Sequence, residues 1–429
     1  MWFLAWLACT GAEDTPTWTA DVSPIVLGRC ATCHADGGVA PFALASYADA
    51  SPRAAAIAAA ATAGTMPPWP AGAGSVALHH DPSLTAAQID TLVAWAEGGA
   101  PEGDPADQAA PLPAVGSSLS RVDRTLVMPE PYAPVGDPDD YRCFILPWDG
   151  TEEEFVTGFN AVPGDPTVVH HVAAFLFPPD TLLGEGVFDT LASWDAADPG
   201  PGYGCFGGPS RTGESLEVPI TQLAQWVPGN QGSDFPEGTG IRVKPGSQIV
   251  LQLHYNVQTP GAVDQTALDL KIDPTVARAA AFAPWLDALW PLGNLLIPAG
   301  NPSVTYTAKG DPAGLWSFLL GDEPDLSAGF DIHSALLHQH VFGRSSRISV
   351  RRASGEEVVL VDIPEYDFNW QITYSFDPVA FAPGDTLELT CTYDNSAAHQ
   401  PDDRTPADVN WGEGTSDEMC VANLYVSER

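Results

Sequence analysis

The chain has 429 residues, of which 45% are hydrophobic and 17% charged, and it contains 40 glycines and 41 prolines. This length exceeds one compact core and predicts several domains. Many short apolar runs end in turn-forming residues, which favours all-β domains over a helical protein. The formal net charge of −38 would repel phosphate backbones and anionic lipid, so nucleic acid is excluded as an expected partner.

Residues 1–16 begin with an apolar stretch that runs from Met1 to Cys9. It is too short to span a bilayer, which takes about 20 residues. The stretch is similar to an export signal without the usual basic start. Cys9 follows Ala8 and precedes small residues, as in the acylation site of a bacterial lipoprotein, although an incidental cysteine explains the pattern equally well. If acylated, Cys9 would be a lipid anchor.

The next predicted domain, residues 17–105, contains a Cys-x-x-Cys-His motif formed by Cys30, Cys33 and His34. At this spacing two thiols can add to the vinyl groups of a haem, and the histidine that follows ligates the iron. A four-thiolate zinc site would need a second cysteine pair, and none lies nearby. The motif therefore predicts haem c.

Met66 is the expected sixth ligand of this haem, because its thioether suits haem iron and the neighbouring prolines would hold its loop extended. His79 and His80 compete for that role, but we interpret them as surface residues. Helices are predicted at 54–63 and from Ser83 onward, with Ser83 as N-cap. The order of these parts resembles the small all-α c-type cytochrome modules of exported bacterial enzymes, which implies a location in the periplasm or on the cell surface.

A Pro- and Ala-rich linker is predicted at 106–117, followed by two β domains at 118–274 and 275–429. In the first, His170 and His171 lie in a β-prone run. Adjacent residues on a regular strand face opposite sides, so both can bind one metal only if the strand bulges there. His254 ends an alternating run in which polar residues share one side. An ordinary pair of core and surface histidines is the alternative interpretation.

In the second β domain, His338 and His340 are predicted on one strand, where the i, i+2 spacing points both imidazoles to one side. Two histidines at this spacing either bind one metal ion together or bind no ligand at all. Met419, between Glu418 and Cys420, would be ordinary core if no metal is bound. Four further cysteines suit two disulfides in an oxidising compartment, with three pairings possible; they are Cys143, Cys205, Cys391 and Cys420.

From about residue 125 to 427 these motifs, in this order, resemble the type II copper monooxygenases, the family of peptidylglycine α-hydroxylating monooxygenase and dopamine β-hydroxylase. The resemblance rests on His170-His171, His254, His338-x-His340, Cys391 to Asn395, and Asp417 to Cys420. It implies two jelly-roll-like β-sandwiches with one copper each. Imidazole supports both oxidation states of copper, and a thioether favours Cu(I).

The resemblance also implies the role of each residue. His170, His171 and His254 would hold an electron-storing copper, and the catalytic copper would be held by His338, His340 and Met419. The implied disulfides are Cys143–Cys205 and Cys391–Cys420. Peptide-amidating relatives carry an arginine two residues before the His-x-His, where this chain has Leu336. A neutral or apolar substrate is therefore expected.

The sequence thus predicts an exported copper-dependent monooxygenase that hydroxylates a C–H bond of a small organic molecule with O2. Its electrons would come from an external donor through the fused haem c. The alternative is a non-enzymatic haem c electron carrier whose β domains bind metal or a partner. A third possibility is an enzyme of the same fold with one copper.

Overall fold

The computed structural model describes residues 15–429 except 37–39, 114, 137–138, 181–185, 217–219, 228–231, 258–260, 321–323, 402–403 and 413. Cys9 and almost all of the expected signal lie outside the described residues. The chain forms two compact units: one comprises residues 1–69 and 82–115, and the other comprises 70–81 and 116–429. Among the described helices, none has the length and apolar character needed to cross a membrane.

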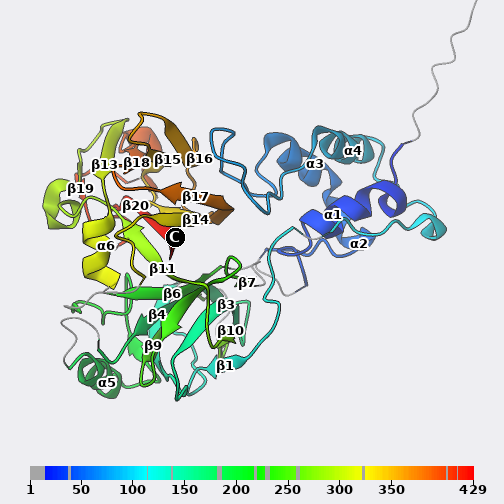
Figure 1. Ribbon diagram of the computed structural model, residues 1–429. Helices are drawn as coiled ribbons and strands as arrows, with labels where there is room; N and C mark the ends of the chain where they lie inside the picture. Colours follow the sequence, from blue (N-terminus) through cyan, green and yellow to red (C-terminus); the bar gives the residue numbers. More distant parts are fainter. Residues whose placement is uncertain are drawn as a thin grey trace, which may run out of the picture. The chain divides into compact units, whose positions relative to one another are not determined.

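The first unit is helical (Figure 1). Its helices are η1 (Trp18–Val22), α1 (Ser23–Arg29), α2 (Tyr47–Ala50), η2 (Ser51–Arg53), α3 (Ala54–Ala63), α4 (Ala86–Glu97) and η3 (Pro105–Asp107). The predicted N-cap of α4 was wrong: the cap is Thr85, whose hydroxyl accepts from the Gln88 N–H while the Gln88 side chain accepts from the Thr85 N–H. This capping box satisfies two free donors at the helix start, which Ser83 cannot do.

The predicted linker lies partly against this helical unit. The backbone N–H groups of Ala109 and Leu112 donate to the carbonyls of Thr19 and Pro24. A Cβ on Gly28 would come within 2.8 Å of the Leu112 Cβ, so α1 needs glycine there to accept the returning chain. Residues 106–112 are thus packed against α1.

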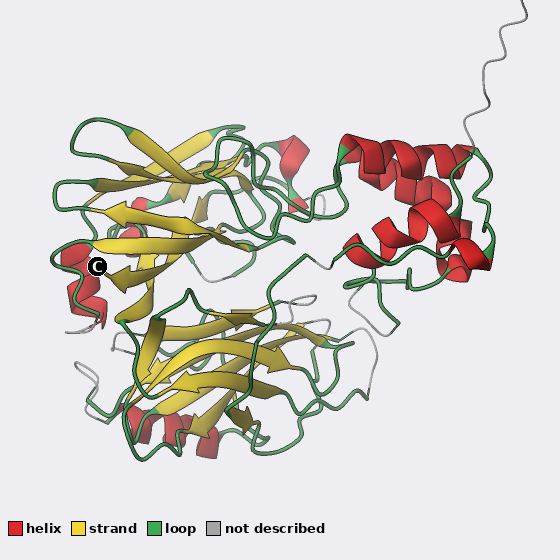
Figure 2. Cartoon of the chain, turned by 45° about the vertical axis from the view of Figure 1, so that its right-hand side comes forward, coloured by secondary structure: helices red, strands yellow, loops and turns green. Residues whose placement is uncertain are grey.

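The second unit is built of β-sheets, as the composition predicted, and Figure 2 shows how few helices accompany them. In its first half a sheet ordered β1-β10-β3-β8, with β7 beside β3, accompanies a sheet ordered β5-β2-β9-β4-β6. The strands are β1 (Arg124–Val127), β2 (Asp139–Pro147), β3 (Glu154–Val162), β4 (Val169–Phe177), β5 (Tyr203–Gly204), β6 (Thr221–Trp226), β7 (Ser233–Asp234), β8 (Thr239–Val243), β9 (Gln248–Asn256) and β10 (Ala267–Asp273), with helix α5 (Val187–Ala197).

The second half repeats the arrangement with a sheet ordered β11-β20-β14-β17 and one ordered β13-β18-β15-β16, beside a small β12-β19 pair. The strands are β11 (Arg278–Trp285), β12 (Leu296–Ile297), β13 (Val304–Gly310), β14 (Phe330–His338), β15 (Gly343–Arg351), β16 (Glu357–Ile363), β17 (Thr373–Phe381), β18 (Thr386–Tyr393), β19 (Val409–Asn410) and β20 (Val421–Glu428). The helices here are η4 (Trp290–Asn294), α6 (Ala313–Leu320) and η5 (Ala397–His399).

One sheet runs through both halves. β8 pairs with β11 in parallel, with Thr239 opposite Arg278, and thereby joins the two four-strand series into a nine-stranded sheet. Tyr425 of β20 belongs to the core of the first half and its hydroxyl lies 3.1 Å from the Thr239 hydroxyl. The halves therefore share a continuous backbone framework, which the sequence did not predict.

Alternation within strands builds the cores. In β9 the side chains of Leu251, Leu253 and Tyr255 are buried, while those of His254 and Asn256 are only partly buried. This is the predicted pattern, and it places the polar side of β9 away from the core cluster of the first half. His254 lies on that polar side.

Residues 70–81 follow the Met66 loop but pack on the second unit, and we call this segment the strap. The N–H of Val76 donates to the Val359 carbonyl of β16, and the N–H of His79 donates to Ser375 of β17. His79 Nε2 also lies 3.1 Å from an exposed Asp377 carboxylate. His79 is thus a surface residue of the second unit, as the sequence indicated.

Candidate metal centres

A bulge in β4 creates the first centre. β4 pairs with β9 so that Val169 lies opposite Tyr255 and His171 opposite His254, which leaves His170 as an extra residue. Two adjacent histidines were predicted to bind one metal ion only if the strand bulges. That condition is met, because a bulge turns both side chains toward one side.

The nitrogens of the three histidines converge. His170 Nδ1 lies 3.1 Å and His171 Nδ1 3.4 Å from His254 Nδ1. One ligand atom from each residue lies within 4.8 Å of the others. Metal–nitrogen bonds of about 2.0–2.1 Å in tetrahedral geometry place donor atoms about 3.3 Å apart, so this spacing fits a single ion.

Burial keeps these imidazoles neutral. It lowers the pKa of His170 to about 4, helped by the neighbouring His254 and opposed by Asp139. The pKa of His171 lies well below its ordinary value for the same main reason, with His170, His254 and His338 adding to it. Neutral imidazole is the form that binds a metal, so the donors are free of competing protons at neutral pH.

The second centre lies at the end of β14. The predicted single strand was wrong, because β14 ends at His338 and His340 lies in the turn before β15. The two rings nevertheless lie with centroids 4.9 Å apart. The turn is fixed by Tyr366, whose hydroxyl accepts from the Gln339 N–H and donates to the Gln339 carbonyl.

Met419 lies beside this pair. His338 pairs with Val421 of β20, two residues beyond Met419, and Met419 is 8% exposed. The buried Glu418 carboxylate accepts from the N–H groups of His340 at 2.8 Å, Phe342 at 2.7 Å and Met419 at 3.1 Å. It therefore ties the histidine turn to the methionine segment.

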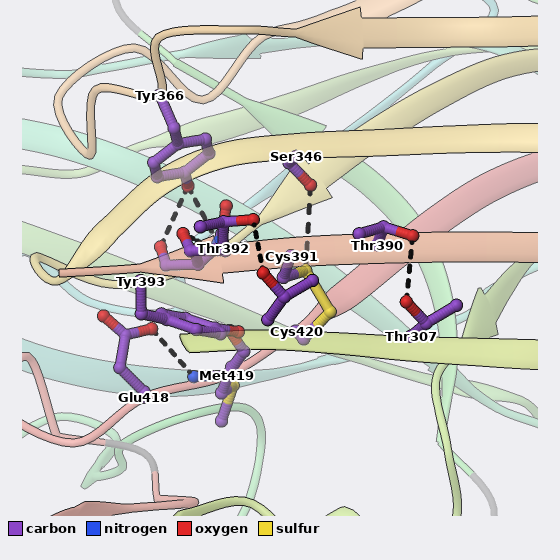
Figure 3. The surroundings of a disulfide bond; sticks show 12 residues. Thr307, Ser346, Tyr366, Thr390, Cys391, Thr392, Tyr393, Glu418, Met419 and Cys420 are labelled. Carbon is purple, nitrogen blue, oxygen red and sulfur yellow. Dashed lines mark hydrogen bonds between the residues drawn. A yellow bond between two sulfur atoms is a disulfide. The ribbon is translucent and has the colours of Figure 1, made fainter. Parts of the chain in front are cut away.

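A disulfide fixes the same segment from the other side (Figure 3). Cys420 is bonded to Cys391 of β18, and a second disulfide joins Cys143 to Cys205, the pairing that the resemblance implied. The Tyr393 hydroxyl donates to the Met419 carbonyl at 2.7 Å. The chain is thus held at three successive residues, Glu418, Met419 and Cys420.

Outer contacts orient both rings. His338 Nδ1 lies 2.6 Å from Gln371 Oε1, and His340 Nδ1 lies 3.1 Å from the Asp417 carbonyl. Since both acceptors are oxygens, each Nδ1 carries the proton and each Nε2 keeps its lone pair. Burial lowers the pKa of His338 to about 4, with His340 adding to the shift and Gln371 opposing it.

The two centres lie in different halves of the β unit, on different sheets. Burial is the main cause that lowers the pKa of His171, and His338 of the second half is the smallest of the contributors. Asn423 of β20 donates to Gln222 Oε1 of β6 across the halves. Side chains of the two halves are therefore hydrogen-bonded to each other within this unit.

Residues 322–427 match the protein family described as copper type II ascorbate-dependent monooxygenase, C-terminal domain. That match contains His338, His340 and Met419. The second β half is similar to the C-terminal domain of these copper enzymes.

Relatives that match over part of their length agree with this family match. The chain is 27% identical over 217 residues to DBH-like monooxygenase protein 1 of Gallus gallus, covering 49% of this chain and 33% of the relative. It is 24% identical over 303 residues to tyramine beta-hydroxylase of Caenorhabditis briggsae, covering 66% and 45%. The chain thus spans a third to under half of these relatives. Among solved structures, a β-porphyranase from Bacteroides plebeius gives a TM-score of 0.17 at 10% identity, covering 69% of this chain and 38% of its own, and this likeness indicates no shared fold.

The Cys-x-x-Cys-His motif lies at the end of α1 in the helical unit. Cys30 and Cys33 are free thiols, and burial with the neighbouring Cys33 raises the pKa of Cys30 to about 11. His34 Nδ1 lies 3.0 Å from the Phe42 carbonyl, which leaves Nε2 available as a ligand. These three residues fit a covalently attached haem. Met66 lies after α3 and is 36% exposed, and its ligand role stays a prediction.

Sequence reasoning missed three residues that support the centres: Asp139, Gln371 and Glu418. Asp139 Oδ1 lies 2.9 Å from His254 Nε2, although it is 115 residues away in the chain. Only the pairing of β2 with β9 brings Asp139 to Asn256 and Tyr141 to His254. Glu418 alone had a signal, since an acidic residue beside a buried Met-Cys pair needs partners.

Proposed function

We propose that the protein is an exported, copper-dependent monooxygenase that hydroxylates a C–H bond of a small organic substrate with O2. The observation that carries this proposal is the convergence of three Nδ1 atoms in one β half, beside a half that matches the copper monooxygenase domain. His170, His171 and His254 would hold one copper. His338, His340 and Met419 would hold the other.

Copper bound in these positions would supply one-electron redox chemistry and the activation of O2. The protein contributes neutral imidazoles with fixed tautomers: His254 carries its proton on Nε2 toward Asp139, whereas His338 carries it on Nδ1 toward Gln371. The Met419 thioether is a soft donor that favours Cu(I). Leu336, at the position where peptide-amidating relatives carry arginine, is 6% exposed and apolar, which supports a neutral or apolar substrate.

Metal analysis of the purified full chain tests the proposal. We expect two copper ions and one iron per chain, and oxygen uptake with a subset of apolar C–H substrates. Iron without copper would support the electron carrier instead, and a single copper would support the one-copper enzyme. The two disulfides support the proposed location, because they suit an oxidising compartment such as the periplasm or the cell surface. Mass spectrometry of the purified protein tests whether Cys9 is acylated.

We further propose that haem c, attached through Cys30, Cys33 and His34, receives electrons from an external donor and passes them to the β unit. The strap supports this. Met66 precedes Pro70 by four residues, so the chain keeps their Cα atoms within about 14 Å, and residues 70–81 are hydrogen-bonded to β16 and β17.

Val76→Pro tests the role of the strap, because it removes the N–H that bonds Val359. Val76→Ala keeps this donor and is the matched control. We expect the proline variant to slow copper reduction by the reduced haem several-fold in stopped-flow measurements, while the alanine variant behaves as wild type. Equal rates in all three proteins would show that the strap does not serve electron delivery.

A further inference from the structure

The two centres differ in the charge of the groups behind their histidines. His254 Nε2 faces the carboxylate of Asp139 at 2.9 Å. At the second centre, His338 Nδ1 faces the neutral amide of Gln371 and His340 Nδ1 faces the backbone carbonyl of Asp417. An anionic acceptor thus occurs behind a ring of the first centre, and neutral acceptors lie behind both rings of the second.

Asp139 is held in place for this contact. Its Oδ1 also accepts from Asn256 Nδ2 at 3.0 Å, and the pairing of β2 with β9 sets Asp139 opposite Asn256. Two residues along β2, Tyr141 stacks on the His254 ring at 4.2 Å with an angle of 5°. Stacking on Tyr141 therefore fixes the plane of the His254 ring, and the contact with Asp139 fixes which way Nε2 points within that plane.

The contact has a chemical consequence for the opposite nitrogen. A carboxylate that accepts the Nε2 proton makes the imidazole a stronger donor through Nδ1. A stronger, more anionic donor stabilises Cu(II) more than Cu(I), because the higher charge gains more from it.

We propose that Asp139 is a positioning residue that lowers the reduction potential of the copper at the three-histidine centre below that of the second centre. This inference rests on the proposed function. With copper held at both sites, this difference in potential would favour movement of an electron from the first centre to the second. Met419 and the neutral acceptors favour Cu(I) there.

The test is Asp139→Asn, with Asp140→Asn as the charge-matched control. Asp140 neighbours Asp139, but its carboxylate accepts from the Tyr132 hydroxyl and the Val135 N–H. Both variants are made in a full chain that also carries His340→Ala, so that the first centre dominates the copper signal. The reduction potential is measured by redox titration followed by electron paramagnetic resonance.

We expect Asp139→Asn to weaken Cu(II) binding relative to Cu(I) by about 10- to 100-fold, which is a rise of about 60–120 mV at about 59 mV per tenfold. Asp140→Asn should change the potential by a small fraction of this. An unchanged potential in Asp139→Asn, or an equal rise in both variants, would overturn the assignment. Absence of copper binding would overturn the proposed function as well, whereas a shifted potential together with no hydroxylation by the chain with His340 intact would overturn the function alone.

A second readout needs no metal. In the copper-free wild type, nitrogen NMR should show the His254 proton on Nε2, and Asp139→Ala should give a mixture of tautomers. Thermal melting of each variant checks that it is folded. A tautomer that does not respond to Asp139→Ala would also count against the proposal.

Discussion

The two β halves bring their candidate ligand residues together by different means. In the first, the irregularity lies inside the strand, where a bulge at His170 brings adjacent side chains together. In the second, the strand ends at His338 and a turn positions His340. The first centre is stabilised through side chains, Asp139 and Tyr141, and the second through backbone contacts from Glu418, Tyr366 and a disulfide.

The largest expected effect separates the two centres by function. We expect His171→Ala and Met419→Ala each to lower the hydroxylation rate by at least about 100-fold. His171→Ala should lose the first copper and keep the second. Met419→Ala should keep the first copper and weaken Cu(I) at the second. Haem absorption serves as the internal control in both, and retained turnover in Met419→Ala would contradict the assignment of that centre.

The disulfides provide the next comparison. Cys143–Cys205 closes a separation of 62 residues and Cys391–Cys420 one of 29, so each should contribute about 3–5 kcal/mol to stability. Replacing either pair by alanine should therefore lower the melting temperature. Only the second replacement should also weaken copper binding at His338 and His340, because Cys420 follows Met419. Equal loss of copper from both centres would argue for a general folding effect.

Glu418→Gln probes the backbone anchoring of the second centre. Burial raises the pKa of Glu418 to about 8, against the effect of the N–H groups of His340, Phe342 and Met419. An amide offers one acceptor oxygen in place of two, so at least one buried N–H loses its partner at a cost of about 1–3 kcal/mol. Denaturant unfolding at about pH 9, where Glu418 with its pKa of about 8 is ionised, measures this cost. Glu356→Gln, an exposed position, is the control and should unfold as wild type does.

The smallest effect concerns a buried histidine away from either centre. Burial lowers the pKa of His333 to about 4, helped by Arg278, and its Nε2 lies 2.9 Å from the Ser427 hydroxyl. The unfolded state has a histidine pKa near 6.5 and binds more protons below it, so stability falls as pH decreases from about 6.5 to 4. We expect the free energy of unfolding to fall by up to about 1.4 kcal/mol per pH unit. His333→Gln should flatten this dependence in denaturant unfolding at pH 6.5 and 5, and an unchanged slope would contradict it.

The sequence by itself determined the residue types and their local spacing. The alternation of β9 predicted which side of the strand His254 occupies, and the adjacency of His170 and His171 predicted that β4 must bulge if both bind one ion. Both features are confirmed in the structure. They were predictable because side-chain direction along a strand depends only on neighbouring backbone geometry.

Only the tertiary structure decided what lies behind the ligands. Asp139 reaches His254 through strand pairing across 115 residues, and Gln371 reaches His338 across 33. The strap joins β16 and β17 from nearly 300 residues away, as His79 and Asp377 show with a separation of 298. Such contacts follow from sheet order and register, which depend on how all the strands pack together, and no local pattern in the chain encodes them.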